Sequence, residues 1–211
     1  MKMKTKPIST VLGLEKPIAT SKESISDEEL WKELQGGSSI AFHQIYKRYA
    51  QSLFNYGKKF TSQRELVEDC IQELFIGLWK YKEKLGDVKN LQSYLLISFR
   101  RTLMQELQKA KRLQLANKKN VKFEIVLSPE WKKINWEIEK EQSQSLLNEL
   151  NKLPEKQREA LFLRYYEGLS CQEISAIFEM NPQSVYNLLN RAVNLLKKRL
   201  LISILIHYIF F

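Results

Sequence analysis

Nearly every segment of this 211-residue chain has the residue spacing of an α-helix, and that pattern excludes most other folds. From Ser26 onward no window alternates apolar and polar residues for more than a few positions, and the whole chain has only seven glycines. A half-buried strand needs such alternation, whereas a helix places apolar residues three and four positions apart. The sequence therefore predicts an all-α protein.

The starts of the predicted helices are marked by capping sequences. In an S-x-x-E capping box, the Ser hydroxyl and the Glu carboxylate satisfy backbone N–H groups at the helix start. Asn181 followed by Pro182 indicates a further start, because Asn is a favoured N-cap and proline fits the first helical position. The three predicted capping boxes are Ser26 with Glu29, Ser62 with Glu65, and Ser170 with Glu173.

These signals group the helices into two blocks, so we expect two helical domains joined by a flexible linker. The segment between the blocks has weak periodicity and a breaker at Ser128-Pro129. The N-terminal stretch is polar and lacks the apolar run of a secretion signal, so we expect a disordered arm there. The expected boundaries are 1–25 for the arm, 26–112 for the first block, 113–142 for the linker, 143–200 for the second block and 201–211 for an apolar tail.

A net charge of +10 indicates a polyanionic partner, either nucleic acid or an anionic membrane surface. A basic face that is merely solvated is the alternative. The cysteines and histidines show neither metal-ligand spacing nor a disulfide framework, which fits a reducing cytoplasm. No catalytic triad, Gly-rich phosphate loop or carboxylate metal site is recognisable. We therefore predict a protein that is not an enzyme and that has no cofactor, bound metal or small-molecule substrate.

The second block contains a predicted helix-turn-helix, in which a short helix over 170–178 precedes the helix that begins at Pro182. No acidic residue follows Met180, and amide and Arg side chains gather on one face of the second helix. Such side chains match base edges in the major groove, while Lys and Arg pair with phosphates. The alternative to a DNA-binding helix-turn-helix is a helical hairpin whose polar face contacts only solvent. The predicted buried stripe is Val185, Leu188, Leu189, Ala192, Leu195 and Leu196. The predicted DNA-contacting residues are Gln183, Ser184, Tyr186, Asn187, Asn190, Arg191 and Lys198.

The segment LPEKQREALFLRYYEGLSCQEISAIFEMNPQSVYNLLNRAVNLLKKRL resembles region 4 of bacterial RNA polymerase sigma factors. The L-P-x-x-x-R-E start, the R-Y-Y-E-G-L-S turn and the helix after it carry the resemblance. It implies that this block reads the promoter −35 element. Glu179 stands where the family's turn often has Gly, and Tyr186 and Leu188 stand where Lys and Arg are common.

In the first block, the helix within SQRELVEDCIQELFIGLWKYKEKL has an acidic face that is unusual in a basic chain. Carboxylates around an exposed Ile favour a protein partner, because they would repel phosphate. The predicted buried positions are Leu66, Val67, Cys70, Ile71, Leu74 and Leu78. The segment resembles sigma region 2, whose D-x-x-Q-E stretch contacts the clamp helices of the largest polymerase subunit. The resemblance implies a core-polymerase surface of Asp69, Gln72 and Glu73, with Ile76 and Trp79 nearby.

The third helix of this block, from about Leu91 to Arg112, becomes basic along its length. The resemblance implies that this helix and the loop over 81–90 bind the −10 element, where flipped bases occupy protein pockets. Tyr94 is predicted to belong to the core. Arg101 and Gln105 replace the Asn and Asp that the family often has. The implied −10 residues are Lys82, Lys84, Lys89, Arg100, Arg101, Gln105 and Lys109.

Two such blocks on a short linker resemble the extracytoplasmic-function subgroup of the sigma-70 family. The implied partners are core RNA polymerase, promoter DNA and an anti-sigma factor. The tail LLISILIHYIFF is shorter than the about 20 residues that span a bilayer, so no transmembrane span is expected. The tail could pack on region 4, dock on a partner or lie on a membrane surface. The alternatives for the whole chain are a stand-alone helix-turn-helix regulator that acts without polymerase and a basic membrane-surface protein.

Overall fold

The computed structural model describes residues 25–113, 123–125 and 146–210, and these residues are helical with no strand among them. The all-α prediction is confirmed. The described residues fall into two compact units, one made of 25–113 and the other of 123–125 and 146–210. The predicted N-terminal arm and most of the predicted linker lie outside the described residues.

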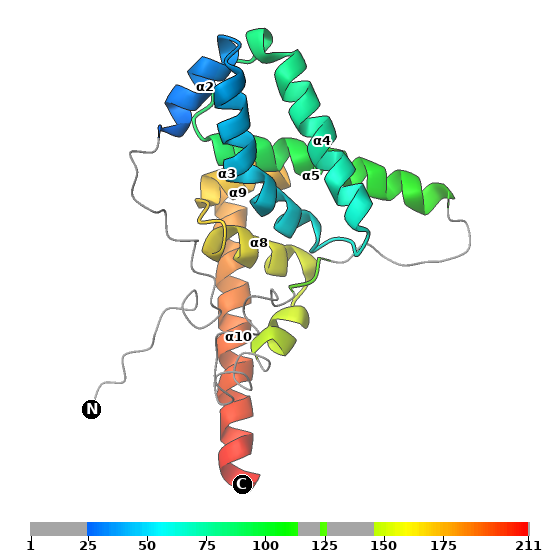
Figure 1. The fold of residues 1–211 in the computed structure, drawn as a ribbon. Helices are drawn as coiled ribbons and strands as arrows, with labels where there is room; N and C mark the ends of the chain where they lie inside the picture. The colour runs from blue at the N-terminus through cyan, green and yellow to red at the C-terminus, as the bar shows by residue number, and fades with distance from the viewer. Residues whose placement is uncertain (1–24, 114–122, 126–145, 211) are drawn as a thin grey trace. The chain divides into compact units, whose positions relative to one another are not determined.

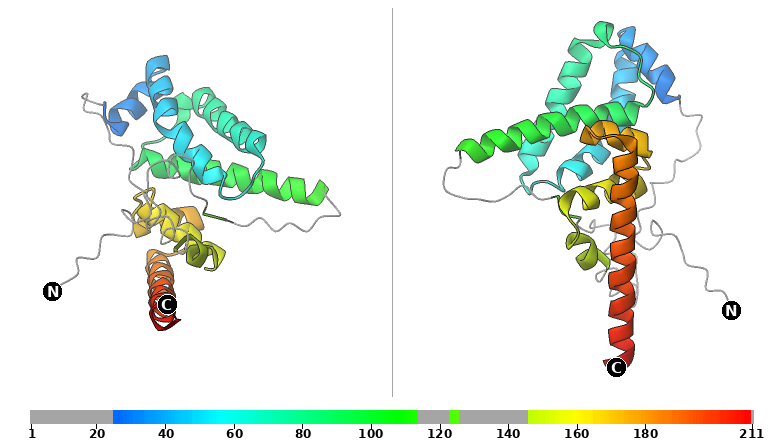
Figure 2. Two further views of the ribbon diagram at one scale, coloured as in Figure 1. Left: turned by 60° about the horizontal axis from the view of Figure 1, so that its bottom comes forward. Right: turned by 180° about the vertical axis from the view of Figure 1, so that it is seen from behind.

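In the first unit, one long helix crosses a pair of others. Figures 1 and 2 show α5 lying across α3 and α4, with α2 beside α3. The close approach depends on Gly57, where an added Cβ would lie 2.7 Å from Val67 Cγ1 and 2.8 Å from Phe99 Cζ. The elements are α2 (Asp27–Gln35), α3 (Ser39–Gly57), α4 (Arg64–Lys80), the 3-10 helix η1 (Lys82–Lys84) and α5 (Leu91–Leu113).

Helix α2 begins at the predicted capping box. Ser26 N donates to Glu29 Oε2 at 2.9 Å, and Glu29 N donates to Ser26 Oγ at 3.2 Å. Its buried residues Leu30, Trp31 and Leu34 recur at helical spacing and pack into the unit. The prediction for this helix start is confirmed.

The predicted capping box at Ser62 is wrong. Helix α4 begins one residue later than that box requires, with Gln63 as its N-cap and no side-chain cap bond. The connection from α3 is short, and its own hydrogen bonds hold it in place. Lys58 Nζ donates to Ser62 O at 2.7 Å, and Gln63 N donates to Thr61 Oγ1 at 3.1 Å. Glu65 therefore falls at the second helical position, where it cannot complete the box.

In the second unit, α8 and α9 pack on α10. Ser170 N donates to Glu173 Oε2 at 2.6 Å and Glu173 N to Ser170 Oγ at 3.2 Å, so this capping box is confirmed. Asn181 Oδ1 accepts from Ser184 N at 2.7 Å, which confirms the Asn181 cap. The elements are a helical segment over 146–151, α8 (Glu155–Tyr165), α9 (Cys171–Phe178) and α10 (Pro182–Phe210).

The apolar tail continues α10 without a break to Phe210, as Figure 1 shows in orange to red. The side chains of the tail lie outside the described residues. Among the residues that the structure describes, no helix combines the length and the apolar character needed to cross a membrane.

Residues 123–125, which the sequence places in the linker, pack on the second unit. Phe123 is fully buried, and its ring meets that of Phe162 edge-on at 5.7 Å between centroids. Asn151 binds the backbone of Ile125 on both sides, accepting from Ile125 N at 3.0 Å and donating to Ile125 O at 2.9 Å. Phe123 N also donates to Glu155 Oε1 at 3.2 Å. This short stretch is thus part of the second folded unit.

Candidate functional site

Helix α4 presents the predicted acidic face to solvent. Asp69, Gln72 and Glu73 are exposed, and Ile76 is 65% exposed. The opposite side is buried, but Leu66 and Leu74, which were predicted to be buried, are only half-buried. The core positions are Val67, Cys70, Ile71, Phe75 and Leu78. A charged face with an exposed apolar residue at its C-terminal end suits a protein–protein contact.

Phe75 replaces Leu74 in the core because it meets aromatic partners on α3. Its ring lies edge-on to Phe42 at 5.9 Å and to Tyr46 at 4.9 Å. Aromatic pairs of this geometry contribute about 0.5–1.5 kcal/mol beyond the burial of their area. The α3–α4 contact therefore holds the acidic face of α4 on a rigid support.

The thiol of Cys70 lies on the buried side, between the two predicted carboxylates in sequence. Burial, together with the carboxylates of Glu106, Glu73 and Asp69, raises the pKa of Cys70 to about 11. The thiol therefore stays protonated at neutral pH and serves as an apolar packing group.

Trp79 lies at the junction between α4 and the loop that follows. It is half-buried and its ring packs against Phe42 at 5.2 Å. Lys82 Nζ sits over the same ring at 4.5 Å and donates to Trp79 O at 3.4 Å. Two predicted site residues with different roles are thus in contact, since Trp79 was assigned to polymerase binding and Lys82 to DNA.

Three of the four predicted −10 residues on α5 share one face. Arg101, Gln105 and Lys109 follow one another at four-residue spacing and are all exposed. Lys109 Nζ lies 2.6 Å from Glu106 Oε1, and this hydrogen bond raises the pKa of Lys109. Arg100 is half-buried on a neighbouring face. In the loop, Lys84 and Lys89 are exposed while Lys82 is half-buried.

The predicted −35 residues lie on the outer face of α10. Gln183, Asn187, Asn190, Arg191 and Lys198 are exposed, Tyr186 is 53% exposed, and Ser184 is half-buried beside the cap. The amides of Gln183 and Asn187 are paired, with Nε2 to Oδ1 at 3.2 Å. The inward stripe is confirmed at Val185, Leu189, Ala192 and Leu196, while Leu188 and Leu195 are half-buried.

The turn before α10 places Glu179 in the left-handed region, with φ 54° and ψ 45°. Within the described ranges it is the one non-glycine residue with positive φ. The sequence places Glu179 where the related turn often has Gly, and a non-glycine residue is strained where the backbone needs a positive φ. Met180 N donates to Ser175 O at 2.9 Å, so the turn closes in spite of this strain.

Sequence reasoning missed two side chains of α2 that bind the loop over 81–90. Trp31 Nε1 donates to Gly86 O at 3.0 Å, and Gln35 Nε2 donates to Leu85 O at 2.6 Å. The four-residue spacing of Trp31 and Gln35 places them on one helix face. The sequence signal was weak, because a Trp and a Gln on an amphipathic helix are common and nothing local points to a loop 50 residues away.

Comparison with protein-family models finds two matches in this chain. The model described as Sigma-70 region 2 matches residues 45–113, and the model described as Sigma-70, region 4 matches residues 143–196. Together they cover more than half of the chain, with region 2 first. The acidic face of α4 and the α5 face lie within the first match, and the exposed face of α10 lies within the second.

Curated relatives match most of the chain. The ECF RNA polymerase sigma factor BldN of Streptomyces coelicolor is 25% identical over 191 residues, which cover 86% of this chain and 69% of that protein. The ECF RNA polymerase sigma-E factor of Escherichia coli is 25% identical over 185 residues, covering 81% of this chain and 92% of that protein.

Solved structures share the fold. The structure of CnrH in complex with the cytosolic domain of CnrY has a TM-score of 0.55 at 19% identity, covering 82% of this chain and 96% of that one. The sigma factor RpoE of Bartonella quintana, solved with the anti-sigma factor NepR, has a TM-score of 0.57 at 21% identity, covering 75% of this chain and 96% of that one.

Proposed function

Since this chain belongs to the sigma-70 family of RNA polymerase sigma factors, in its extracytoplasmic-function subgroup, we propose that its two units divide promoter recognition between them. The first unit binds core RNA polymerase and the −10 element, and the second unit binds the −35 element. The observation that carries the proposal is the pair of family matches, region 2 before region 4, on one chain.

Core polymerase is bound through the exposed face of α4. Asp69, Gln72 and Glu73 form its polar part, and Ile76 supplies an apolar anchor at its C-terminal end. An interface of this kind combines a buried apolar contact with a charged rim that steers association. Trp79 is half-buried beside this face and supports the end of α4 by packing against Phe42.

The −10 element is bound by α5 and the loop before it. Arg101, Gln105 and Lys109 line the exposed side of α5, and Arg100 lies beside them. Lys84 and Lys89 extend the basic surface along the loop, while Lys82 holds the loop against Trp79. Unstacking a base costs a few kcal/mol, which stacking and phosphate contacts offset.

The −35 element is bound in the major groove by the exposed face of α10. Gln183, Asn187, Asn190 and Arg191 suit base edges, with Ser184 and Tyr186 beside them at the helix start. Lys198 suits a phosphate farther along the helix. The paired amides of Gln183 and Asn187 hold both side chains in order before DNA arrives.

The same proposal covers location and partners. We place the protein in the cytoplasm, where polymerase and promoters are, and assign the chemistry of RNA synthesis to the polymerase. An anti-sigma factor is proposed as a regulatory partner, in line with the relative solved with NepR. The domain limits stay as predicted, except that we assign residues 123–125 to the second unit.

The test is transcription in vitro with core bacterial RNA polymerase on a pooled library of promoters, with and without the protein. We expect discrete starts that require the protein, and we expect Asp69→Lys with Glu73→Lys to abolish them. The matched control reverses two other exposed carboxylates of the first unit, Glu65→Lys with Glu83→Lys, and keeps the starts.

A different outcome would point to a different protein. If the chain binds promoter DNA tightly without polymerase, and the double variant at Asp69 and Glu73 behaves as the wild type, then it is a stand-alone regulator. If the variant and the matched control lose the starts equally, the α4 face is not the surface that binds core polymerase.

A further inference from the structure

Helix α2 lies ahead of the family match that begins at residue 45, yet it contacts the loop between α4 and α5. Trp31 Nε1 donates to Gly86 O at 3.0 Å. Gln35 Nε2 donates to Leu85 O at 2.6 Å and lies 3.5 Å from Gly86 O. Two side chains one turn apart on α2 thus bind two successive carbonyls of the loop.

These carbonyls belong to irregular backbone, just after η1. Carbonyls outside helices and strands depend on side chains or water for hydrogen bonds. A loop whose carbonyls bind to fixed side chains has fewer accessible conformations than a loop bonded only to water. The positions of Leu85 and Gly86 are therefore set by α2 as well as by the loop's own sequence.

Trp31 also contacts the other end of the loop. Its ring meets that of Tyr94 edge-on at 5.2 Å between centroids, and Trp31 is only 2% exposed. Tyr94 lies in the first turn of α5, which Asn90 caps by accepting from Ser93 N at 2.8 Å. One indole thus fixes the distance between residue 86 and the start of α5, which bracket residues 87–90.

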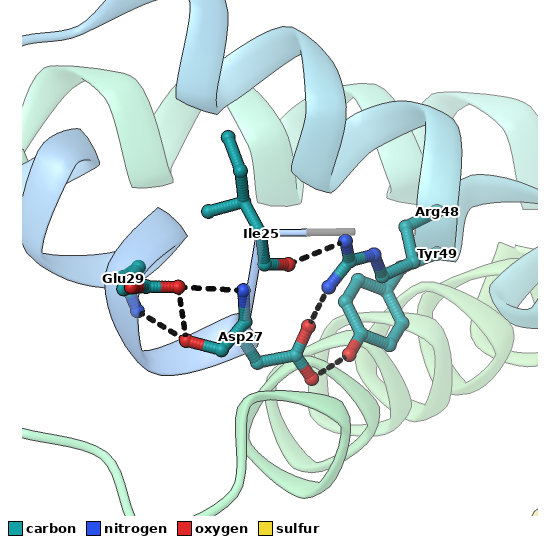
Figure 3. Close-up of polar contacts among 6 residues, drawn as sticks. Ile25, Asp27, Glu29, Arg48 and Tyr49 are labelled. Atoms are coloured by element: carbon teal, nitrogen blue, oxygen red, sulfur yellow. Dashed lines mark hydrogen bonds and ion pairs between the residues drawn. The ribbon is translucent and has the colours of Figure 1, made fainter. Parts of the chain in front are cut away.

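Helix α2 is itself fixed to α3. Figure 3 shows the carboxylate of Asp27 accepting hydrogen bonds from Arg48 and Tyr49, while Arg48 Nη2 donates to Ile25 O at 2.9 Å. The capping box of Ser26 and Glu29 closes the same end of the helix. The support behind Trp31 and Gln35 is therefore rigid.

We infer that α2 sets the conformation of the loop 85–90, which makes Trp31 and Gln35 positioning residues for selection of the −10 element. The inference rests on the proposed function, in which this loop borders the −10 site. A pocket discriminates between bases only when its walls are held in place before the base enters. Loss of the two bonds leaves α5 and its basic face intact but lets the loop adapt to the wrong base.

The experiment uses the full-length protein with core RNA polymerase and two promoter libraries, one randomised at the −10 element and one at the −35 element. Gln35→Glu keeps almost the same shape but replaces the N–H donors by a carboxylate that repels the two carbonyls. Trp31→Phe removes the indole N–H but keeps a ring beside Tyr94. Gln35→Lys keeps a donor, and Glu33→Gln changes an exposed residue of the same helix.

We expect Gln35→Glu to lower the preference for the best −10 sequence over single-base variants by about fivefold, as the loss of one hydrogen bond implies. Trp31→Phe acts in the same direction, and both keep the −35 preferences. Gln35→Lys and Glu33→Gln keep both sets of preferences.

Unchanged −10 preferences in both Gln35→Glu and Trp31→Phe would overturn the inference while leaving the proposed function in place. An equal loss at both elements would also overturn it, in favour of a general folding role for α2. If the wild-type protein produced no starts from either library, the proposed function would fall and this inference with it.

Discussion

Each unit contains a short element that lies ahead of its family segment, and the two elements contact different kinds of structure. In the first unit, α2 donates hydrogen bonds to the loop at Leu85 and Gly86. In the second unit, residues 123–125 bind Asn151, Glu155 and Phe162, which belong to the helices that support α10. Helix α2 therefore fixes a loop proposed to bind DNA, whereas residues 123–125 fix the helices that support α10.

This contrast suggests that α2 affects the choice of promoter sequence, while residues 123–125 affect the stability of the second unit. A loop has no internal ladder of hydrogen bonds, so side chains from elsewhere decide its shape. The exposed face of α10 is a helix surface, and its shape follows from the helix and from the buried stripe beneath it. Changes at α2 should therefore alter what the protein selects, whereas changes at residues 123–125 should alter how firmly the second unit folds.

The largest effect is expected from Phe123→Ala. This change removes a fully buried ring, so the free energy of unfolding of the second unit should fall by about 3–5 kcal/mol. Hydrogen exchange resolved by residue would measure each unit separately. Lys156→Gln, at an exposed position of α8, is the control and should change little. A loss shared equally by residues 25–113 would contradict the assignment of this stretch to the second unit.

A smaller effect is expected from Arg191→Ala on the exposed face of α10. Loss of an Arg contact to a base costs about 1–3 kcal/mol of discrimination, so the preference at one or two −35 positions should relax. Lys197→Gln removes the same charge from the same helix at a position outside the proposed base contacts. If both variants weaken binding equally at every sequence, Arg191 contacts phosphate rather than a base.

The smallest effect is expected from Glu179→Gly, at the turn before α10. A non-glycine residue in the left-handed region costs about 1–2 kcal/mol, and the extra freedom of Gly in the unfolded chain offsets part of it. We expect a gain of about 1 kcal/mol, or several degrees in Tm of the second unit. Glu179→Ala keeps the Cβ and should give no such gain. A lower Tm with Gly would show that the Glu side chain stabilises the turn.

The helices and their faces could be predicted from the sequence, because their signals are local. The capping boxes at Ser26 and Ser170 and the Asn181 cap are confirmed, as is the exposed acidic face of α4. The box at Ser62 failed because the same motif also occurs where a short connection shifts the helix start by one residue.

The contacts that join distant segments could not be predicted. Trp31 and Gly86 are 55 residues apart, and helical periodicity gives no information on such pairs. For residues 123–125 a weak signal was present, since VKFEI alternates apolar and polar residues, but five residues within a segment of weak periodicity are also typical of a linker. Asn151 could not be identified as the partner of Ile125, because a side chain that binds the backbone of a distant segment has no sequence signature.

The division of promoter recognition between the two units can be tested by comparing Arg191→Ala and Gln35→Glu on the same pair of promoter libraries with core RNA polymerase. If one unit reads each element, Arg191→Ala will change only the −35 preferences and Gln35→Glu only the −10 preferences. Starts that do not depend on the protein, or variants that each alter both elements alike, would contradict the division of promoter recognition between the two units.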